Sequence, residues 1–175
     1  MALLLKQNPV GLDIIVNRVQ NKLFPLIADW AVDIDIYPRC YISKTKEGTK
    51  DIYYYAGADE NPTVLYAETN KFFFTSDYEL EQSGNDYYKT KLDLYVILNV
   101  QEIKDIEHRA DEECVVDILN ALSSCVGIKV KKVFKGIERV FNAFEYSIEG
   151  DLQPYFVAKF ELDVLEFDIN NNCIN

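Results

Sequence analysis

Residues that could carry out acid–base or metal chemistry are few in this 175-residue chain. His108 is the only histidine, so a site with two histidine ligands cannot be built. A single histidine at the start of an expected helix is typical of a surface residue rather than a catalytic base. The sequence also lacks a glycine-rich phosphate loop, a G-x-S-x-G motif and an H-E-x-x-H motif. We therefore expect a protein that is not an enzyme and that needs no metal or cofactor.

Two groups of residues contain carboxylates that could bind a metal ion or act in catalysis, but the pattern of neither group favours such a site. The acidic run 59–61 follows Gly57, whereas an EF-hand loop places its glycine between the ligands, so we interpret this segment as a solvated loop. Asp33 and Asp35 alternate along an expected strand and would share one face of it. They could act as paired carboxylates, but the pattern favours the polar outer face of a half-buried strand.

A basic cluster stands out because the chain as a whole is acidic. Its formal charge is −11, which argues against a protein whose whole surface serves to bind the phosphates of a nucleic acid. The cluster could dock on an acidic surface, including that of a neighbouring identical subunit, or it could line a solvated strand edge, where lysines discourage aggregation. A DNA contact is a third, weaker interpretation. The basic residues are Lys129, Lys131, Lys132, Lys135 and Arg139.

Two runs of three aromatic residues predict strands that are apolar on both faces. Successive side chains of a strand point to opposite faces, so three consecutive rings give both faces aromatic surface. A helix layer covers only one face of a small sheet, which leaves the other for a neighbouring subunit. The pattern therefore favours an oligomer. The residues in these runs are Tyr53, Tyr54, Tyr55, Phe72, Phe73 and Phe74.

A long strand is expected over residues 87–103, and the basic and aromatic residues described above must be positioned around it. Its side chains alternate between an aliphatic face and a mixed face, which is the period of a β-strand. A second strand over 155–167 repeats the alternation, and we expect the two to pair in antiparallel fashion. The mixed face, which includes Tyr95 and Ile97, is the first place to look for a neighbouring subunit or a DNA channel. The aliphatic face contains Leu92, Leu94, Val96 and Leu98.

Two amphipathic helices are expected to cover the aliphatic face. The first begins after Asn8, a residue that can cap a helix, and Pro25 should end or kink it. The second spans 105–125, with acidic residues in its early turns, and Gly127 is placed to end it.

The order of elements predicts an α+β fold, a mostly antiparallel β-sheet with two α-helices packed on one face. A β-hairpin over 33–56 follows the first helix. The whole chain, 1–175, is expected to be a single domain. We expect a flexible arm at 1–8, a mobile loop at 79–86 and a polar tail at 168–175.

The cysteines and the hydropathy of the chain indicate a cytoplasmic protein. The four cysteines form no C-x-x-C pair, which favours reduced thiols. The N-terminal sequence MALLLKQNP has no basic region or cleavage site, so it does not predict a signal peptide. No apolar stretch approaches the length of a membrane span, and we expect no membrane partner. The cysteines are Cys40, Cys114, Cys125 and Cys173.

The order of elements resembles that of the tail-terminator or tail-completion proteins of bacteriophages, a head–tail joining family. The likeness rests on an amphipathic helix, a hairpin, the strand LDLYVILNV, the helix ECVVDILNALSS and the closing segment EYSIEGDLQPYFVAKFELDVLEF. It covers residues 9–167 and is one of pattern, because the family has no signature residues to carry over. Two features depart from the family pattern: extra residues at 57–86 and the basic run at 129–139.

The resemblance implies a structural virion protein that acts by assembly. Such proteins form a homo-oligomeric ring, commonly a hexamer, that ends or completes the tail and joins it to the neck. The implied partners are the tail tube, the neck or connector and DNA that passes as cargo through the lumen. The protein would be located in the virion, and in the host cytoplasm during assembly. Two other interpretations stay open: another neck or tail ring component of a short-tailed phage, and a non-viral cytoplasmic binding module that uses its sheet face.

Overall fold

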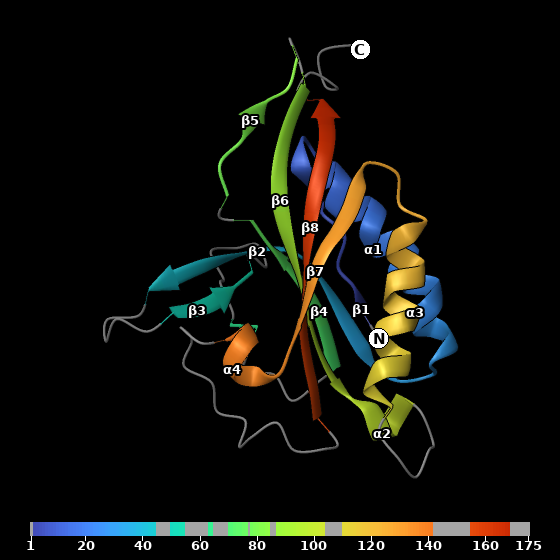
Figure 1. Cartoon of the computed structure of the whole chain (residues 1–175). Helices are drawn as coiled ribbons and strands as arrows, with labels where there is room; N and C mark the ends of the chain where they lie inside the picture. Colours follow the sequence, from blue (N-terminus) through green and yellow to red (C-terminus); the bar gives the residue numbers. More distant parts are fainter. Residues whose placement is uncertain are drawn as a thin grey trace.

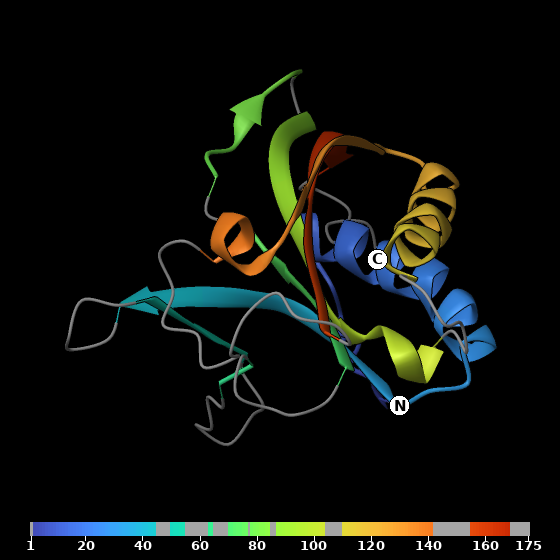
Figure 2. The ribbon, with the colours of Figure 1, turned by 60° about the horizontal axis from the view of Figure 1, so that its bottom comes forward.

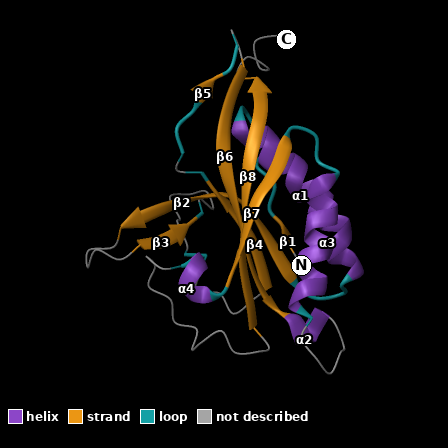
Figure 3. Ribbon diagram, viewed as in Figure 1, coloured by secondary structure: helices purple, strands orange, loops and turns teal. Residues whose placement is uncertain are grey.

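The computed structural model describes residues 2–44, 50–54, 63–64, 70–76, 78–84, 87–103, 110–141 and 155–168. Within these ranges the chain forms an eight-stranded sheet and four helices (Figures 1 and 3). The predicted α+β class is confirmed. The predictions for His108, Tyr55, Cys173 and the acidic run 59–61 lie outside the described residues.

The main path of the sheet runs in the order β1-β2-β4-β6-β8-β7, with β3 paired to β2 and β5 paired to β6. The strands are β1 (Ala2–Leu3), β2 (Ile34–Lys44), β3 (Lys50–Tyr53), β4 (Asn70–Thr75), β5 (Glu81–Gln82), β6 (Tyr87–Asn99), β7 (Ile128–Lys135) and β8 (Tyr155–Asp168). The helices are α1 (Leu12–Asp29), α2 (Val100–Ile103), α3 (Asp111–Ser123) and α4 (Ile137–Val140).

The sheet is mixed, whereas the sequence analysis expects a mostly antiparallel one. β2 runs parallel to both β1 and β4, and the remaining pairs are antiparallel. β2 and β4 are parallel because β4 begins beside the start of β2, where Asn70 is opposite Ile34. After the β2–β3 hairpin, the chain thus returns to the end at which β2 began. The alternation of polar and apolar residues along a strand does not show at which end the next strand begins, so it does not predict whether a pair is parallel.

The antiparallel pair β6–β8 is the longest in the sheet and joins the two strands that the sequence predicts. Their register runs from Tyr87 opposite Asp168 to Asn99 opposite Tyr155. β6 ends at Asn99 rather than at residue 103, because the last four residues of the predicted strand form α2.

Helices α1 and α3 share one hydrophobic core with one face of the sheet (Figure 2). Buried residues recur along both helices at intervals of three or four, so each presents one apolar side to the sheet. The sheet contributes the predicted aliphatic side chains of β6 and the matching ones of β8. Fully buried members of this core include Val19, Leu23, Ile27, Ile118, Phe72, Phe74, Leu92, Leu94, Phe160 and Leu162.

The predicted first helix starts later and continues further than the sequence indicates. Asn8 does not cap it, since α1 begins at Leu12 and Asn8 lies in a turn with a positive φ of 51°, a conformation that asparagine tolerates. Pro25 does not end it, since α1 continues to Asp29. Proline deprives the carbonyl of Asn21 of its helical donor, but both residues are exposed, so water can satisfy that carbonyl.

The opposite face of the sheet is covered by other parts of the same chain. β3 and α4 contribute to a second core there, and Tyr95 stacks between Phe73 at 4.9 Å and Phe141 at 5.5 Å between ring centroids. This removes the reason for which the aromatic runs favour an oligomer, because no neighbour is needed to cover them. The buried residues of this core are Tyr37, Cys40, Ile52, Val64, Phe73, Tyr95, Ile97, Val140, Phe141 and Val157.

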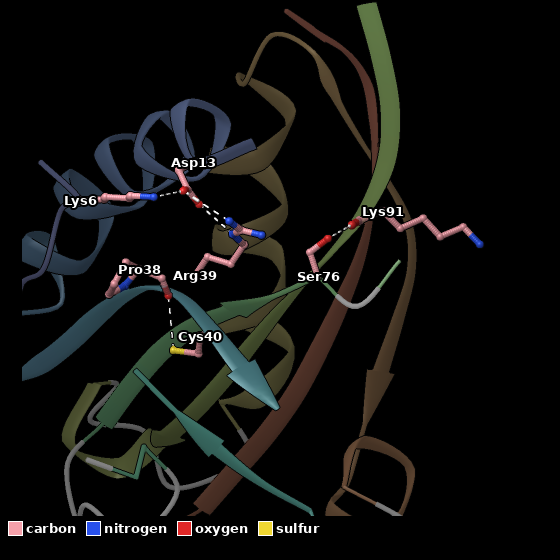
Figure 4. Close-up of polar contacts among 7 residues, drawn as sticks. All are labelled: Lys6, Asp13, Pro38, Arg39, Cys40, Ser76 and Lys91. Atoms are coloured by element: carbon pink, nitrogen blue, oxygen red, sulfur yellow. Dashed lines mark hydrogen bonds and ion pairs between the residues drawn. The ribbon is translucent and has the colours of Figure 1, made fainter. Parts of the chain in front are cut away.

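The expected arm and mobile loop both contain residues that pair with the sheet. In the arm, Ala2–Leu3 form β1 beside β2, and Lys6 contacts the carboxylate of Asp13 on α1. Arg39 of β2 donates to the same carboxylate at 2.7 Å (Figure 4). Burial raises the pKa of Asp13, but the hydrogen bonds from these two cations lower it more, so the pKa lies below its usual value. In the loop, Glu81–Gln82 form β5 beside β6.

Lys71 on β4 is a charged residue inside the second core. Its side chain is 1% exposed, and its Nζ donates to the carbonyl of Val64 at 3.0 Å. Burial lowers the pKa of Lys71 to about 8, against the opposing influence of Asp35, which is its cross-strand partner. Folding therefore carries an electrostatic cost wherever this lysine is protonated.

We expect Lys71→Met to stabilise the fold at neutral pH. The folded pKa of about 8 lies below the ordinary value of 10.5, so the native state binds fewer protons than the unfolded state between these values. The wild type therefore gains stability as pH rises through that window, whereas the variant does not. Near neutral pH, the variant should unfold with a free energy about 1–2 kcal/mol higher, after allowing for the lost hydrogen bond.

Urea unfolding of both proteins at near-neutral pH and at about pH 10 measures this difference. Lys22→Met removes an exposed lysine from α1 and serves as the matched control. A difference between Lys71→Met and the wild type that stays the same across the pH range would contradict the electrostatic cost.

Candidate functional site

Charged side chains form rows across β6, β8 and β7, on the face that points away from α1 and α3. In one row Asp93 lies opposite Glu161, which lies opposite Lys132. Cross-strand partners project from the same face, so the residues of each row are neighbours. The next row is Lys91, Asp163 and Lys129. We call this surface the charged platform; it consists of Lys91, Asp93, Lys129, Lys132, Lys159, Glu161 and Asp163.

Asp93 is the most deeply buried residue of the charged platform, with 5% of its surface exposed. Tyr78 donates a hydrogen bond from Oη to Oδ2 at 3.0 Å, and Lys159 Nζ lies 3.5 Å from the same oxygen. The other carboxylate oxygen is buried and accepts no hydrogen bond from the described residues. Burial raises the pKa of Asp93, and Lys159 and Tyr78 offset this only in part. The arrangement fastens the segment before β5 to the sheet, at the cost of an incompletely satisfied carboxylate.

Lys159 connects the charged platform to the aromatic core below it. Its Nζ lies 3.3 Å from Glu161 and 4.8 Å from the ring centroid of Phe134. The cation therefore contacts two carboxylates and one aromatic face, and most of its side chain is covered. Such an arrangement holds the strands in register rather than offering a free amine for chemistry.

A groove of about 440 Å³ opens beside the charged platform. One wall is the segment before and within β5, and the floor is formed by β6 and the end of β8. Carboxylates and lysines both line it, together with exposed apolar surface from Tyr78 and Leu165. The groove therefore presents a mixed polar and apolar surface. Its lining residues are Tyr78, Glu79, Glu81, Lys89, Thr90, Lys91, Asp163, Val164 and Leu165.

The predicted basic cluster is divided by the fold. Lys129, Lys131 and Lys132 are exposed on β7, the last strand of the sheet, and we call them the basic rim. Lys131 is the extra residue of a β-bulge, because Val130 pairs with Leu162 and Lys132 pairs with Glu161. The other two members differ from these: Lys135, the last residue of β7, forms an ion pair with Glu112 of α3, and Arg139 is exposed on α4.

Most of the predicted aromatic interface is part of the interior. The side chains of the 72–74 run are fully buried, and Tyr95 and Ile97 are nearly so. This corrects the expectation that they contact a neighbouring subunit, because β3 and α4 cover the second face of the sheet. Tyr53 and Tyr54 are half-buried. The residues of the buried run are Phe72, Phe73 and Phe74.

Sequence reasoning missed the contact that Tyr78 makes with Asp93. Tyr78 lies just before the predicted mobile loop, and no periodicity connects it with Asp93 fifteen residues later. A signal was nevertheless present, because Asp93 interrupts the mixed face of β6 where Tyr95 and Ile97 follow. A buried carboxylate at such a position needs a donor.

Features that would indicate metal or membrane chemistry are not seen in the described part of the chain. There, no group of three His, Cys, Asp or Glu side chains is placed to hold a metal ion. Of the two alternating carboxylates at 33 and 35, that of Asp35 accepts a hydrogen bond from the backbone N–H of Ala2 at 3.2 Å. Cys40, Cys114 and Cys125 are buried free thiols. None of the described helices is long and apolar enough to span a bilayer.

Comparison with models of known protein families finds none that matches this chain, and comparison with curated proteins finds no similar sequence.

The Tyr78–Asp93 contact gives a test of the charged platform. Tyr78→Phe should lower the free energy of unfolding by about 1–2 kcal/mol, because it removes a hydrogen bond to a buried carboxylate. The loss should become smaller in an Asp93→Asn background, where the acceptor carries no charge. Chemical unfolding of the two single variants and the double variant measures the coupling.

Tyr87→Phe is the matched control, since that tyrosine is exposed on β6. Equal effects of the two tyrosine substitutions, or strict additivity with Asp93→Asn, would show that the hydrogen bond does not stabilise the fold.

Proposed function

We propose that this chain is a structural assembly protein of a bacteriophage, which forms a homo-oligomeric ring at the head–tail junction. It would terminate or complete the tail and join it to the neck, without catalytic activity. The proposal rests on the resemblance in element order and on one structural observation, the basic rim on the outermost strand of the sheet. The placement of α1 and α3 over one face, with a hairpin extending from the sheet, supports a tail-terminator-like arrangement.

The basic rim lies on a strand edge that is open within the described residues. β7 pairs with β8 on one side only, and no described strand pairs with its other side. The bulge at Lys131 and the three lysines make this edge a poor template for continuing the sheet. A partner would therefore contact the rim through side chains, and its surface would have to be acidic.

The charge of the rim favours a ring over a twofold dimer. In a twofold contact the same patch meets itself, so the lysines of one copy would oppose those of the other. A heterologous contact sets the rim against a different surface, and an identical subunit with net charge −11 offers ample acidic surface. Repetition of a heterologous contact generates a closed ring where the rotation permits closure.

The acidic character of the chain suits a ring through which DNA passes. Negative charge on the wall of a lumen repels the phosphates of a duplex, so the DNA would move through as cargo without binding. The tail tube and the neck or connector would be the remaining partners. A ring component in the neck of a short-tailed phage would use the same kind of contact.

A second candidate function is favoured by the groove beside the charged platform. A groove of about 440 Å³ with mixed polar and apolar lining is suited to a binding module for a ligand or partner protein. Such a module would need no ring.

Charge reversal on the basic rim tests the ring. Native mass spectrometry of the wild type, over a range of concentrations, should show a closed oligomer, with six subunits as the expected number. Lys131→Glu and Lys132→Glu should each shift the assembly toward single chains, and the two together should abolish it, because the rim would then repel an acidic neighbour.

The matched control is Lys22→Glu, which makes the same change in net charge on the outer side of α1. A wild type that stays a single chain at every concentration would contradict the proposed function. A ring that survives both rim substitutions would show that the rim is a solvated edge and that another surface makes the contact.

A further inference from the structure

A segment between β4 and β6 follows the edge of β6 beyond the point at which β4 ends (Figure 1). Its described residues are Ser76 and 78–84, and we call them the strap. The two residues of β5, Glu81–Gln82, lie within the strap and pair with β6. Every strap residue from 78 to 84 is exposed, and none of them belongs to either hydrophobic core. Burial of apolar surface therefore contributes little to holding the strap in place.

Side-chain hydrogen bonds fasten the strap to β6. Ser76 Oγ donates to the carbonyl of Lys91 at 2.9 Å (Figure 4), and Thr90 Oγ1 donates to the carbonyl of Glu79 at 3.1 Å. The Tyr78–Asp93 hydrogen bond lies in the same stretch. Each of these contacts is exchanged for a contact with water when the strap leaves β6, so its net stabilisation is modest.

Two polar side chains of β6 that contact the strap are kept from water. Asp93 is 5% exposed and Thr90 is 7% exposed, and each has a hydrogen-bond partner in the strap. Oδ1 of Asp93 is buried and accepts no hydrogen bond from the described residues. Water reaches this oxygen when the strap opens, which relieves the cost of an unsatisfied acceptor. The strap is thus weakly held and covers a group that is better solvated outside, which favours local opening.

We propose that the strap opens as one unit when the Tyr78–Asp93 hydrogen bond breaks, while the rest of the sheet stays folded. Opening uncovers Asp93 and the floor of the groove, to which the strap contributes Tyr78, Glu79 and Glu81 as one wall. The strap is therefore a cover that controls access to the charged platform. This device operates within one chain, so it does not depend on the proposed ring.

Hydrogen exchange of individual backbone amides tests the opening. The amide of Ser83 donates to the carbonyl of Tyr87 at 2.9 Å and reports on the strap, whereas the amides of Leu94 and Val96 lie in the β6–β8 pair. After correction for intrinsic rates, Ser83 should exchange about 100-fold or more faster than these two amides. Low concentrations of urea should accelerate exchange in the ladder and leave that of Ser83 unchanged, because local opening exposes little surface.

Tyr78→Phe shows whether the strap opens as a unit. Ser83 lies five positions along the chain from Tyr78, and loss of a hydrogen bond to a carboxylate should accelerate its exchange about tenfold. The matched control is Tyr155→Phe, since that tyrosine is exposed at the other end of the β6–β8 pair, and it should leave Ser83 unchanged.

The charges that share the sheet face with Asp93 come from the strap and three strands. Burial raises the pKa of Asp93, Lys159 and Tyr78 lower it in part, and Glu161 raises it further. On β4, the residue opposite Asp93 is Thr75, which carries no charge. The titratable residues of the face around Asp93 are Tyr78 of the strap, Lys91 of β6, Lys159, Glu161 and Asp163 of β8, and Lys129 and Lys132 of β7.

Opening of the strap should become more frequent as pH rises. The closed strap holds a proton on Asp93 more tightly than the open strap, in which the pKa returns toward its ordinary value of 3.8. Opening is therefore least favourable when Asp93 is protonated, and it becomes more favourable as pH rises through the raised pKa. Exchange of Ser83, corrected for intrinsic rates and measured from about pH 4 upward, follows this change. Asp93→Asn should abolish it.

Three results would overturn the proposal. Exchange of Ser83 that is unaffected by Tyr78→Phe would show that β5 frays by itself. Exchange of Ser83 at the rate of Leu94 and Val96, with the same dependence on urea, would show that the strap leaves only when the whole chain unfolds. A pH dependence that persists in Asp93→Asn would show that Asp93 is not the group that opening solvates. None of these results bears on whether copies of the chain form a ring.

Discussion

The antiparallel ladder between β6 and β8 is the constraint on which the rest of the structure depends. Because side chains alternate along both strands, the register of this pair determines which side chains lie together on each face of the sheet. Leu92 and Leu94 meet Leu162 and Phe160 under α1 and α3, while Asp93 lies opposite Glu161 on the other face. A shift of one residue would bury the charges of the platform and expose the core. The lysine at 159, in contact with two carboxylates, adds electrostatic support to the same register.

The sequence predicts this ladder well, because its signal is local alternation. Which segment covers each face of the sheet depends on residues far away in the sequence, so local alternation does not predict it. The aromatic run at 72–74 correctly indicates a strand that is apolar on both sides, but it cannot say whether a neighbouring subunit or the chain itself covers the second side. The parallel pairing of β2 with β4 escapes prediction for a related reason, since the path between them determines direction. Pro25 is tolerated inside α1 because of its exposure, which only the packed structure defines.

The candidate site likewise has one part that the sequence predicts and another that depends on tertiary contacts. The basic rim is visible in the sequence as a run of lysines, and the fold shows which of them share an edge and which, like Lys135, form an ion pair instead. Asp93 and Tyr78 are brought together by the pairing of β5 with β6, which lies in a segment without periodicity. Charge therefore identifies the rim from sequence, whereas the groove and the charged platform depend on tertiary contacts. Both the rim and the groove are suited to recognition of another polypeptide.

In the proposed ring, two different surfaces of one chain meet when copies assemble, which a ring requires and a twofold dimer does not. Electron-microscopic class averages of the purified wild-type protein test this most directly, since they show the symmetry of the assembly. We expect a closed ring with cyclic symmetry, in which β7 of each subunit faces a different surface of its neighbour. A twofold dimer with β7 against β7, or particles no larger than a single chain, would contradict it.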